Sequence, residues 1–179
     1  MLGKFVKPFW GIRAFFYKIV FHKIGALSYL GKPIFITGGK KVEIGSKVRI
    51  FPGMRLEVHN KGRITISDDV VIGQNVHITC GQSLIIGSKT LITPNVVITD
   101  IDHNYTDIGI HVVKQEYITS PTIIGENCFI GAGAVIQAGS VLGKQCVVGA
   151  NSVVRGCFPD YSVIVGSPAK VVKRFNDAN

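Results

Sequence analysis

The sequence predicts an all-β chain that folds as a left-handed parallel β-helix of hexapeptide repeats, with a short helical segment at its N-terminus. An aliphatic residue recurs at every sixth position between Ile44 and Val154, in groups separated by short or long breaks. A period of six fits neither an α-helix nor strands joined by hairpin turns. Three short strands joined by tight turns instead close one triangular coil, and successive coils stack as parallel strands.

Turn and core positions follow from the same repeat. The third residue after the aliphatic is often Gly or Asn, the types that tolerate positive φ, at Gly53, Asn75, Gly81, Asn95, Asn127, Gly133, Gly139 and Asn151. The fourth is commonly small or slender, at Val48, Val70, Thr90, Cys128, Ala134, Ser140, Cys146 and Ser152. We expect these side chains in the core, with Cys128 and Cys146 stacked as buried hydrophobes and not as a redox pair.

The chain of 179 residues is predicted to form one domain with a small appendage. Residues 1–33 form an aromatic, basic and helical N-terminal segment, residues 34–175 form the β-helix, and residues 176–179 form a tail. The aliphatic spacing fails over a long stretch between Ile98 and Ile124, which predicts an inserted loop at residues 100–121. A long loop in so regular a scaffold is usually functional.

The first 50 residues carry the net charge of the chain. Residues 1–50 hold ten of the 20 Lys and Arg and only one acidic residue, Glu43, whereas the rest of the chain is balanced. This asymmetry argues against a domain that binds nucleic acid. Aromatic and basic residues interleave over residues 1–30 and predict one or two amphipathic helices, the first beginning near Pro8. Two interpretations stay open, a peripheral contact with the membrane surface and a cap on the open end of the β-helix.

No apolar run of signal or membrane-spanning length occurs near the N-terminus, so we expect a cytoplasmic protein, at the inner face of the membrane if residues 1–30 contact lipid. The four cysteines form no C-x-x-C pair and have no His at zinc-finger spacing. Reduced thiols and no metal are therefore expected.

The C-terminal half carries three motifs: I-I-G-E-N-C-F-I-G-A-G-A-V-I, V-V-G-A-N-S-V-V and V-G-S-P-A-K-V-V-K. With these the sequence resembles the hexapeptide-repeat acyltransferases over about residues 64–175. It particularly resembles the branch of maltose, galactoside and nodulation-factor O-acetyltransferases and the related capsule and lipopolysaccharide acetyltransferases. The resemblance implies acetyl-CoA as acetyl donor, no metal, and a homotrimer with active sites between neighbouring β-helices.

Within this resemblance His103, in the D-I-D-H-N segment at the start of the loop, stands where the family has its catalytic histidine. A sugar hydroxyl is a poor nucleophile at neutral pH, and an imidazole can accept its proton as the oxygen attacks a thioester. A neighbouring carboxylate would fix the tautomer of the ring. Asp100 and Asp102 are the candidates, and Glu116 is a more distant one. From residue type alone, a loop histidine that caps a turn is the competing interpretation.

The resemblance also implies the binding surfaces. Small residues at Gly131, Ala132 and Ala150 would let the pantetheine arm of the coenzyme reach the backbone. Other residues on the coenzyme side would be Phe129, Arg155, Gly156, Lys170 and Lys173. His77 and Thr79 would lie on the acceptor side. There the sequence departs from the sugar acetyltransferases, with a short connection from Ile78 to Ile86 and Thr79 in place of Asn.

The predicted function is O-acetylation of a hydroxyl on a sugar or a glycan precursor. The alternative is N-acetylation of an amino or nucleotide sugar. A γ-class carbonic anhydrase would share the fold but needs three His on zinc, and the five His here lack that spacing. A non-catalytic scaffold is the third class of function.

Overall fold

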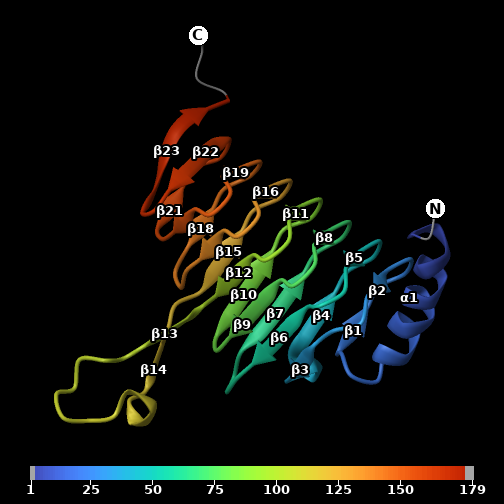
Figure 1. The fold of residues 1–179 in the computed structure, drawn as a ribbon, viewed down its shortest axis with the longest axis horizontal. Helices are drawn as coiled ribbons and strands as arrows, with labels where there is room; N and C mark the ends of the chain where they lie inside the picture. Colours follow the sequence, from blue (N-terminus) through green and yellow to red (C-terminus); the bar gives the residue numbers. More distant parts are fainter. Residues whose placement is uncertain (1–2, 176–179) are drawn as a thin grey trace.

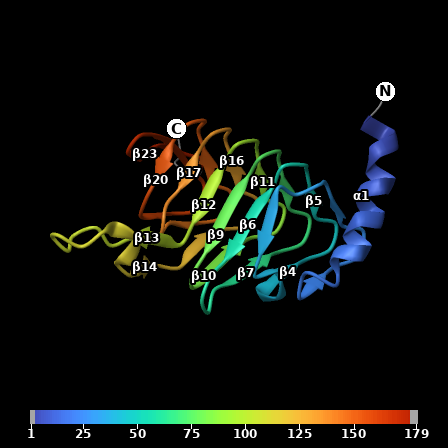
Figure 2. The same ribbon diagram turned by 60° about the horizontal axis from the view of Figure 1, so that its bottom comes forward.

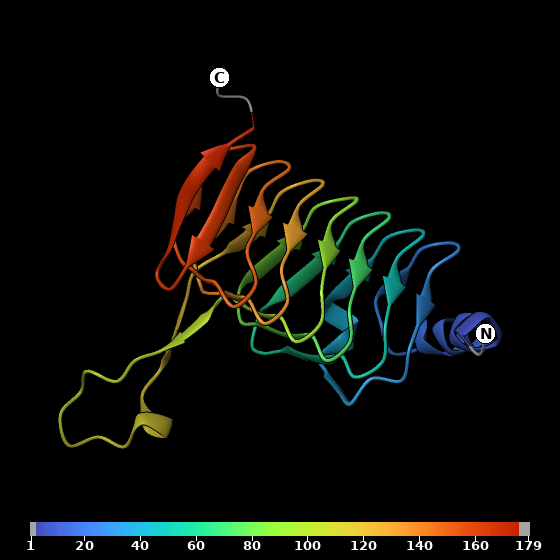
Figure 3. The ribbon, with the colours of Figure 1, turned by 45° about the horizontal axis from the view of Figure 1, so that its top comes forward.

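The computed structural model describes residues 3–175, so the predicted tail at 176–179 and the first two residues lie outside the described part. Short strands wind through successive coils, which stack along one axis as Figures 1 and 3 show. Pairing within each long sheet is parallel apart from the last strand, which turns back against its neighbour. The predicted all-β parallel β-helix with a short N-terminal helix is confirmed.

Three sheets, A, B and C, form the sides of the coil. Sheet A contains β1 (Lys23–Ile24), β4 (Val42–Ile44), β7 (Arg63–Ile66), β10 (Ser83–Ile86), β15 (Thr122–Ile124), β18 (Val141–Leu142) and β21 (Cys157–Phe158). Sheet B contains β2 (Tyr29–Leu30), β5 (Arg49–Ile50), β8 (Val71–Ile72), β11 (Leu91–Ile92), β16 (Phe129–Ile130), β19 (Val147–Val148), β22 (Ser162–Gly166) and β23 (Ala169–Arg174). Sheet C contains β3 (Phe35–Thr37), β6 (Arg55–Val58), β9 (His77–Cys80), β12 (Val97–Thr99), β17 (Val135–Ile136) and β20 (Val153–Val154).

The core is the interior of the coil, and the six-residue repeat identifies it. Every aliphatic of the series from Ile44 to Val154 is buried, as are the eight slender side chains predicted to lie beside them. Cys128 and Cys146 are free thiols inside the coil. A hydrogen bond between the two thiols and burial raise the pKa of Cys128. Both cysteines are therefore packing residues, as predicted.

Most turns have the predicted left-handed backbone. Gly53, Asn75 and Asn95 have φ of 90°, 54° and 62°, and Lys47 and Lys89 adopt positive φ at the same repeat position without being Gly or Asn. Gly81 is the exception among the predicted turn residues, because its φ is not positive. Its turn is stabilised differently, by a buried carboxylate described below.

The β-helix begins earlier than the sequence predicted. β1 and β2 pair in register with β4 and β5, so the first coil starts at Lys23, inside the segment assigned to residues 1–33. Ile24, Leu30 and Ile36 in fact keep the six-residue spacing and align with the next coil. Aromatic and basic neighbours conceal this spacing when the sequence alone is read.

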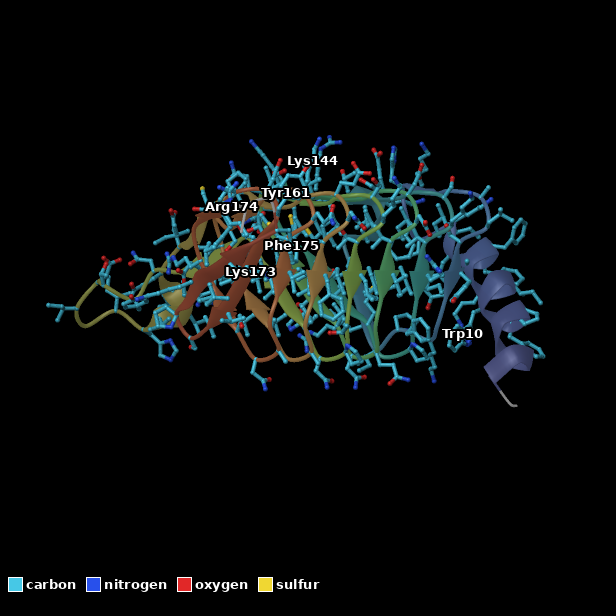
Figure 4. All side chains as sticks on the ribbon, turned by 90° about the horizontal axis from the view of Figure 1, so that it is seen from above. Trp10, Lys144, Tyr161, Lys173, Arg174 and Phe175 are labelled. Atoms are coloured by element: carbon cyan, nitrogen blue, oxygen red, sulfur yellow. The ribbon has the colours of Figure 1, made fainter. Side chains whose placement is uncertain are left out.

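One helix, α1 (Gly3–Tyr17), precedes the first coil. It begins five residues before the predicted start, and Pro8 lies inside it. Ala14 is buried, and Trp10 packs against Tyr29 and Phe51 with ring centroids 5.7 and 5.6 Å apart. The helix thus covers the open N-terminal end of the solenoid, where Figure 4 places Trp10 beside the first coil. No helix among residues 3–175 is long and apolar enough to cross a membrane.

The predicted loop forms an arm that projects from the solenoid. It leaves β12, runs through β13 (Ile101–His103), the 3-10 helix η2 (Val112–Lys114) and β14 (Tyr117–Thr119), and returns to β15. β13 and β14 pair antiparallel, and Figure 2 shows the arm far from α1. Ile108 and Val113 near its tip are 101% and 81% exposed. A second 3-10 helix, η1 (Gly39–Lys41), joins β3 to β4.

Candidate functional site

His103 lies at the root of the arm, at the end of β13. Its register partner across the hairpin is Tyr117, and the two rings meet edge to face with centroids 4.8 Å apart. The imidazole is exposed, so a ligand can reach it. The pairing of the two strands therefore fixes the ring beside an aromatic wall while leaving its nitrogens accessible.

Asp100 lies three residues earlier and is fully buried. Its carboxylate accepts hydrogen bonds from the backbone N–H groups of Gly81, Gln82 and Ser83, at 2.6, 2.9 and 2.7 Å. The thiol of Cys80 lies 3.2 Å from the same carboxylate, and burial together with the charge of Asp100 raises the pKa of Cys80 to about 12. These contacts fix the turn between β9 and β10 and give Asp100 a structural role. They direct its carboxylate to the turn and not to the ring of His103.

Asp102 is the other carboxylate that the sequence singled out. Its Oδ1 accepts from the backbone N–H of His103 at 3.0 Å, and its Oδ2 lies 3.4 Å from Nη2 of Arg155. Arg155 follows β20, two coils along the solenoid from the strand that leads into the arm. The ion pair therefore connects the root of the arm to the C-terminal coils. Arg155, which was expected on the coenzyme side, therefore lies next to Asp102, which was expected beside His103.

A polar cluster occupies the outer face of sheet C, which we call the sheet C cluster: Arg55, Glu57, His59, His77 and Thr79. Nε2 of His77 lies 3.1 Å from Oε1 of Glu57 and 3.0 Å from the hydroxyl of Thr79. The guanidinium of Arg55 donates to the same carboxylate. That hydrogen bond is the main cause that lowers the pKa of Glu57, whose side chain is only 14% exposed. The two acceptor-side residues that the sequence predicted are thus in direct contact.

Tyr117, on β14 of the arm, lies between this cluster and His103. Its ring centroid is 6.2 Å from that of His59 and 4.8 Å from that of His103. A nearly continuous surface therefore runs from His77 through Glu57, His59 and Tyr117 to His103. Polar groups that converge beside an aromatic wall are typical of a site for a polar small molecule.

Glu57, His59 and Tyr117 were missed by the sequence analysis. Glu57 could have been found, because aligning Leu56 with Ile78 places it beside Thr79 on the next strand. Tyr117 could not, since its position depends on the antiparallel pairing of β13 with β14 inside a loop without repeats.

The small residues expected to line the coenzyme groove lie at the corner between sheets B and C. Gly131 packs so closely on the next coil that a Cβ would approach the backbone nitrogen of Ala150 to 2.6 Å. Ala132 and Ala150 are exposed, and the Ala132 carbonyl accepts from the N–H of Asn151 at 2.9 Å. Phe129 is half-exposed on sheet B. The corner therefore offers an accessible backbone with little side-chain cover, which fits an extended chain of amides.

Lys170 and Lys173 lie on β23, where they pair with Val165 and Val163 of β22. Both side chains are exposed at the C-terminal end of the molecule, and Figure 4 labels Lys173 there. Gly156, next to Arg155, has φ of 111°. The predicted site residues therefore form two groups in a single chain. His77, Thr79, Asp102, His103, Arg155 and Gly156 lie toward sheet C and the arm, and Phe129, Gly131, Ala132, Ala150, Lys170 and Lys173 lie on sheet B and its corner.

Among residues 3–175 no group of three or more His, Cys, Asp or Glu side chains is arranged to hold a metal ion.

Comparison with known proteins supports the interpretation of the repeat. Residues 121–156 match the family model "Bacterial transferase hexapeptide (six repeats)". The chain is 41% identical over 76 residues to the probable acetyltransferase Rv3034c of Mycobacterium tuberculosis, covering 42% of this chain and 25% of that protein. It is 34% identical over 94 residues to the putative lipopolysaccharide biosynthesis O-acetyl transferase WbbJ of Escherichia coli, covering 49% and 48%. The chain thus spans less than half the length of these curated relatives.

Solved structures share the fold over nearly the whole chain. Galactoside acetyltransferase in complex with coenzyme A is 25% identical with a TM-score of 0.64, covering 92% of this chain and 70% of that one. AntD, an N-acyltransferase from Bacillus cereus in complex with dTDP and 3-hydroxybutyryl-CoA, has a TM-score of 0.78 at 21% identity, covering 90% and 87%. Fold and repeat define a hexapeptide-repeat β-helix. The predicted resemblance to the hexapeptide-repeat acyltransferases, which include galactoside and lipopolysaccharide acetyltransferases, is thereby confirmed.

Proposed function

We propose that this chain is an acetyltransferase that moves an acetyl group from acetyl-CoA to a hydroxyl of a sugar or glycan precursor. The observation that carries the proposal is the position of His103, exposed at the root of the arm and continuous with the sheet C cluster through Tyr117. The curated relatives named as acetyltransferases and the structure named as a complex with coenzyme A support the same chemistry.

His103 acts as general base. Its ring nitrogen accepts the proton of the acceptor hydroxyl while the hydroxyl oxygen attacks the carbonyl carbon of the thioester. The C–S bond breaks as the new ester bond forms, and the imidazolium returns its proton to the departing sulfur. Asp102 positions the start of the arm, because its carboxylate accepts a hydrogen bond from the backbone N–H of His103. His77, Thr79 and Glu57 offer the hydrogen-bonding groups that would hold the acceptor.

The coenzyme would extend along the corner between sheets B and C. There the exposed backbone near Ala132 and Ala150 can bond the amides of pantetheine, and Lys170 and Lys173 lie farther along for its phosphates. In one chain this corner and the root of the arm lie at opposite ends of the sheet C strands. The resemblance implies a homotrimer, and we propose that in it one β-helix provides His103 and its neighbour provides the coenzyme groove.

N-acetylation of an amino or nucleotide sugar is the second candidate. It is favoured by the fold shared with AntD, described as an N-acyltransferase in complex with dTDP and 3-hydroxybutyryl-CoA, and by the Glu57 carboxylate beside His77, which can accept a hydrogen bond from an amine. The two products differ in stability, because mild alkali cleaves an ester and leaves an amide intact.

A turnover screen tests the proposal. Free thiol released from acetyl-CoA would be followed with sugars, amino sugars, nucleotide sugars and lipid-linked glycans as acceptors, with alkali treatment of each product. We expect release that depends on one acceptor class and on His103. A protein that binds coenzyme but shows no acceptor-dependent release would favour a scaffold. Activity that requires added zinc would favour a carbonic anhydrase-like site.

A further inference from the structure

Helix α1 is apolar on two faces, although only one of them packs on the solenoid. The inner face carries Trp10, Ala14 and Tyr17, which lie at helical spacing against the first coil. The outer face carries Phe9, Ile12 and Phe16 at the same spacing, and these side chains are 66%, 57% and 62% exposed. Phe15 and Ile19 beside them are also exposed.

Capping the β-helix accounts for the inner face only. A helix that covers the end of a solenoid normally presents polar residues to water, because nothing further packs on it. Single exposed apolar residues need no explanation, but a stripe of large ones along one helix face indicates a binding surface. The outer face of α1 therefore needs an occupant.

The charge of this end of the molecule identifies the occupant. Lys18 lies 5.7 Å from the ring of Phe15, and Lys23, Lys32 and Lys40 are exposed on the adjoining coil. Glu43 is the only acidic residue before position 50. A second copy docked end to end would bring two strongly basic ends together, whereas an anionic surface complements the charge.

We propose that α1 lies on the surface of a bilayer containing anionic lipid, with Phe9, Ile12 and Phe16 inserted at the boundary between headgroups and acyl chains. A helix with lysines flanking an aromatic face suits this position. Its 15 residues fit a helix lying on the bilayer and not one crossing it. The arm and the β22–β23 hairpin lie far from α1 along the solenoid, so they stay clear of the lipid (Figures 1 and 2).

Flotation of the full-length chain with vesicles tests this contact independently of any enzymatic activity. Vesicles of phosphatidylcholine alone would be compared with vesicles of equal parts phosphatidylcholine and phosphatidylglycerol. We expect binding to the anionic vesicles that weakens as salt is added. Since each basic residue near such a surface strengthens binding roughly fivefold, the double change Lys18→Glu and Lys23→Glu should weaken binding at least about 25-fold.

The triple change of Phe9, Ile12 and Phe16 to Ser removes the apolar contribution and should abolish flotation while the exposed positions leave folding intact. Val172→Ser and Lys144→Glu make the same kinds of change at exposed sites on the opposite end, and both should bind like the unchanged chain. Absence of binding to anionic vesicles at low salt, or unchanged binding by the triple variant, would overturn the proposal. Lipid-free association end to end that the triple variant removes would assign the face to a second copy instead.

Discussion

A substitution of His103 can test its catalytic role without disturbing the fold. His103 is exposed and makes its ring contact only with Tyr117 among the aromatic contacts described, so His103→Ala should leave the fold and coenzyme binding unchanged. Turnover should fall by roughly 10²–10⁴-fold, the usual contribution of one positioned acid–base group. Steady-state kinetics with the acceptor found by the screen would measure it.

His22→Ala is the matched control, since His22 is also exposed but lies at the N-terminal end near Glu43. It should retain full turnover. Wild-type turnover in His103→Ala would remove His103 from the mechanism and direct attention to His77 and Glu116. Loss of coenzyme binding in the same variant would mean that the arm folds over the groove.

Replacing Asp100 and Asp102 by Asn should change the free energy of unfolding by different amounts. Asp100→Asn places an amide among three backbone N–H donors, so at least one buried donor loses its acceptor, at a cost of about 1–3 kcal/mol. Asp102→Asn changes a partly exposed group and should alter the free energy of unfolding by less than about 0.5 kcal/mol. Urea unfolding of both variants would test this. Equal stability of the two would contradict the structural role of Asp100.

The lowered pKa of Glu57 predicts that the stability of the folded chain depends on pH. Because the hydrogen bond from Arg55 lowers its pKa in the folded state, the folded state holds its proton less tightly than the unfolded chain does. The stabilisation is therefore complete above the ordinary pKa of Glu, about 4.3, and is lost as the pH falls through the lower value of the folded state. The melting temperature of Glu57→Gln should change less over this acidic window than that of the unchanged chain. Parallel curves for the two would show that Glu57 contributes nothing.

At the scale of elements, the sequence predicts the strands that belong to the six-residue repeat, but it does not predict the structure of the arm, where the repeat stops. The strands of sheets A, B and C follow from a spacing that side-chain burial enforces, because a shift by one residue would turn the aliphatic side chains outward. The same rule predicts that Glu57 neighbours Thr79. The pairing of β13 with β14 depends on contacts within the arm, so neither Tyr117 nor the orientation of Asp102 could be derived.

Helix α1 shows a second limit. The preference of Pro for a first turn placed its start near Pro8, whereas the helix begins at Gly3 and continues through Pro8. The local preference of Pro therefore did not set the first residue of the helix, whereas Trp10, Ala14 and Tyr17 pack the part after Pro8 on the solenoid. The first coil was missed for a related reason, since aromatic residues around Ile24 and Leu30 made the segment resemble part of the helix.

At the scale of the whole molecule, the separation of His103 from the corner between sheets B and C predicts a site shared between chains, and the resemblance to the hexapeptide-repeat acyltransferases implies that three chains assemble. In a single chain Ile108 and Val113 of the arm are 101% and 81% exposed. Burying them against a neighbouring chain would stabilise the assembly by about 1.5–3 kcal/mol for each side chain. Light scattering should therefore give about three times the chain mass of 19.4 kDa.

Introducing charged residues near the tip of the arm tests whether the tip contacts a neighbouring chain. Ile108→Asp with Val113→Asp should dissociate the trimer, because assembly would then bury unpaired carboxylates. The separated chains should keep their circular dichroism and melting behaviour, since neither side chain packs on its own solenoid, yet lose turnover as each groove loses one wall. Leu27→Asp, an equally drastic change at an exposed turn of the first coil, should leave both mass and activity unaltered. A fully active monomer would refute the shared site. A trimer that persists with both carboxylates in place would show that the arm points to solvent and that some other face of the β-helix holds the chains together.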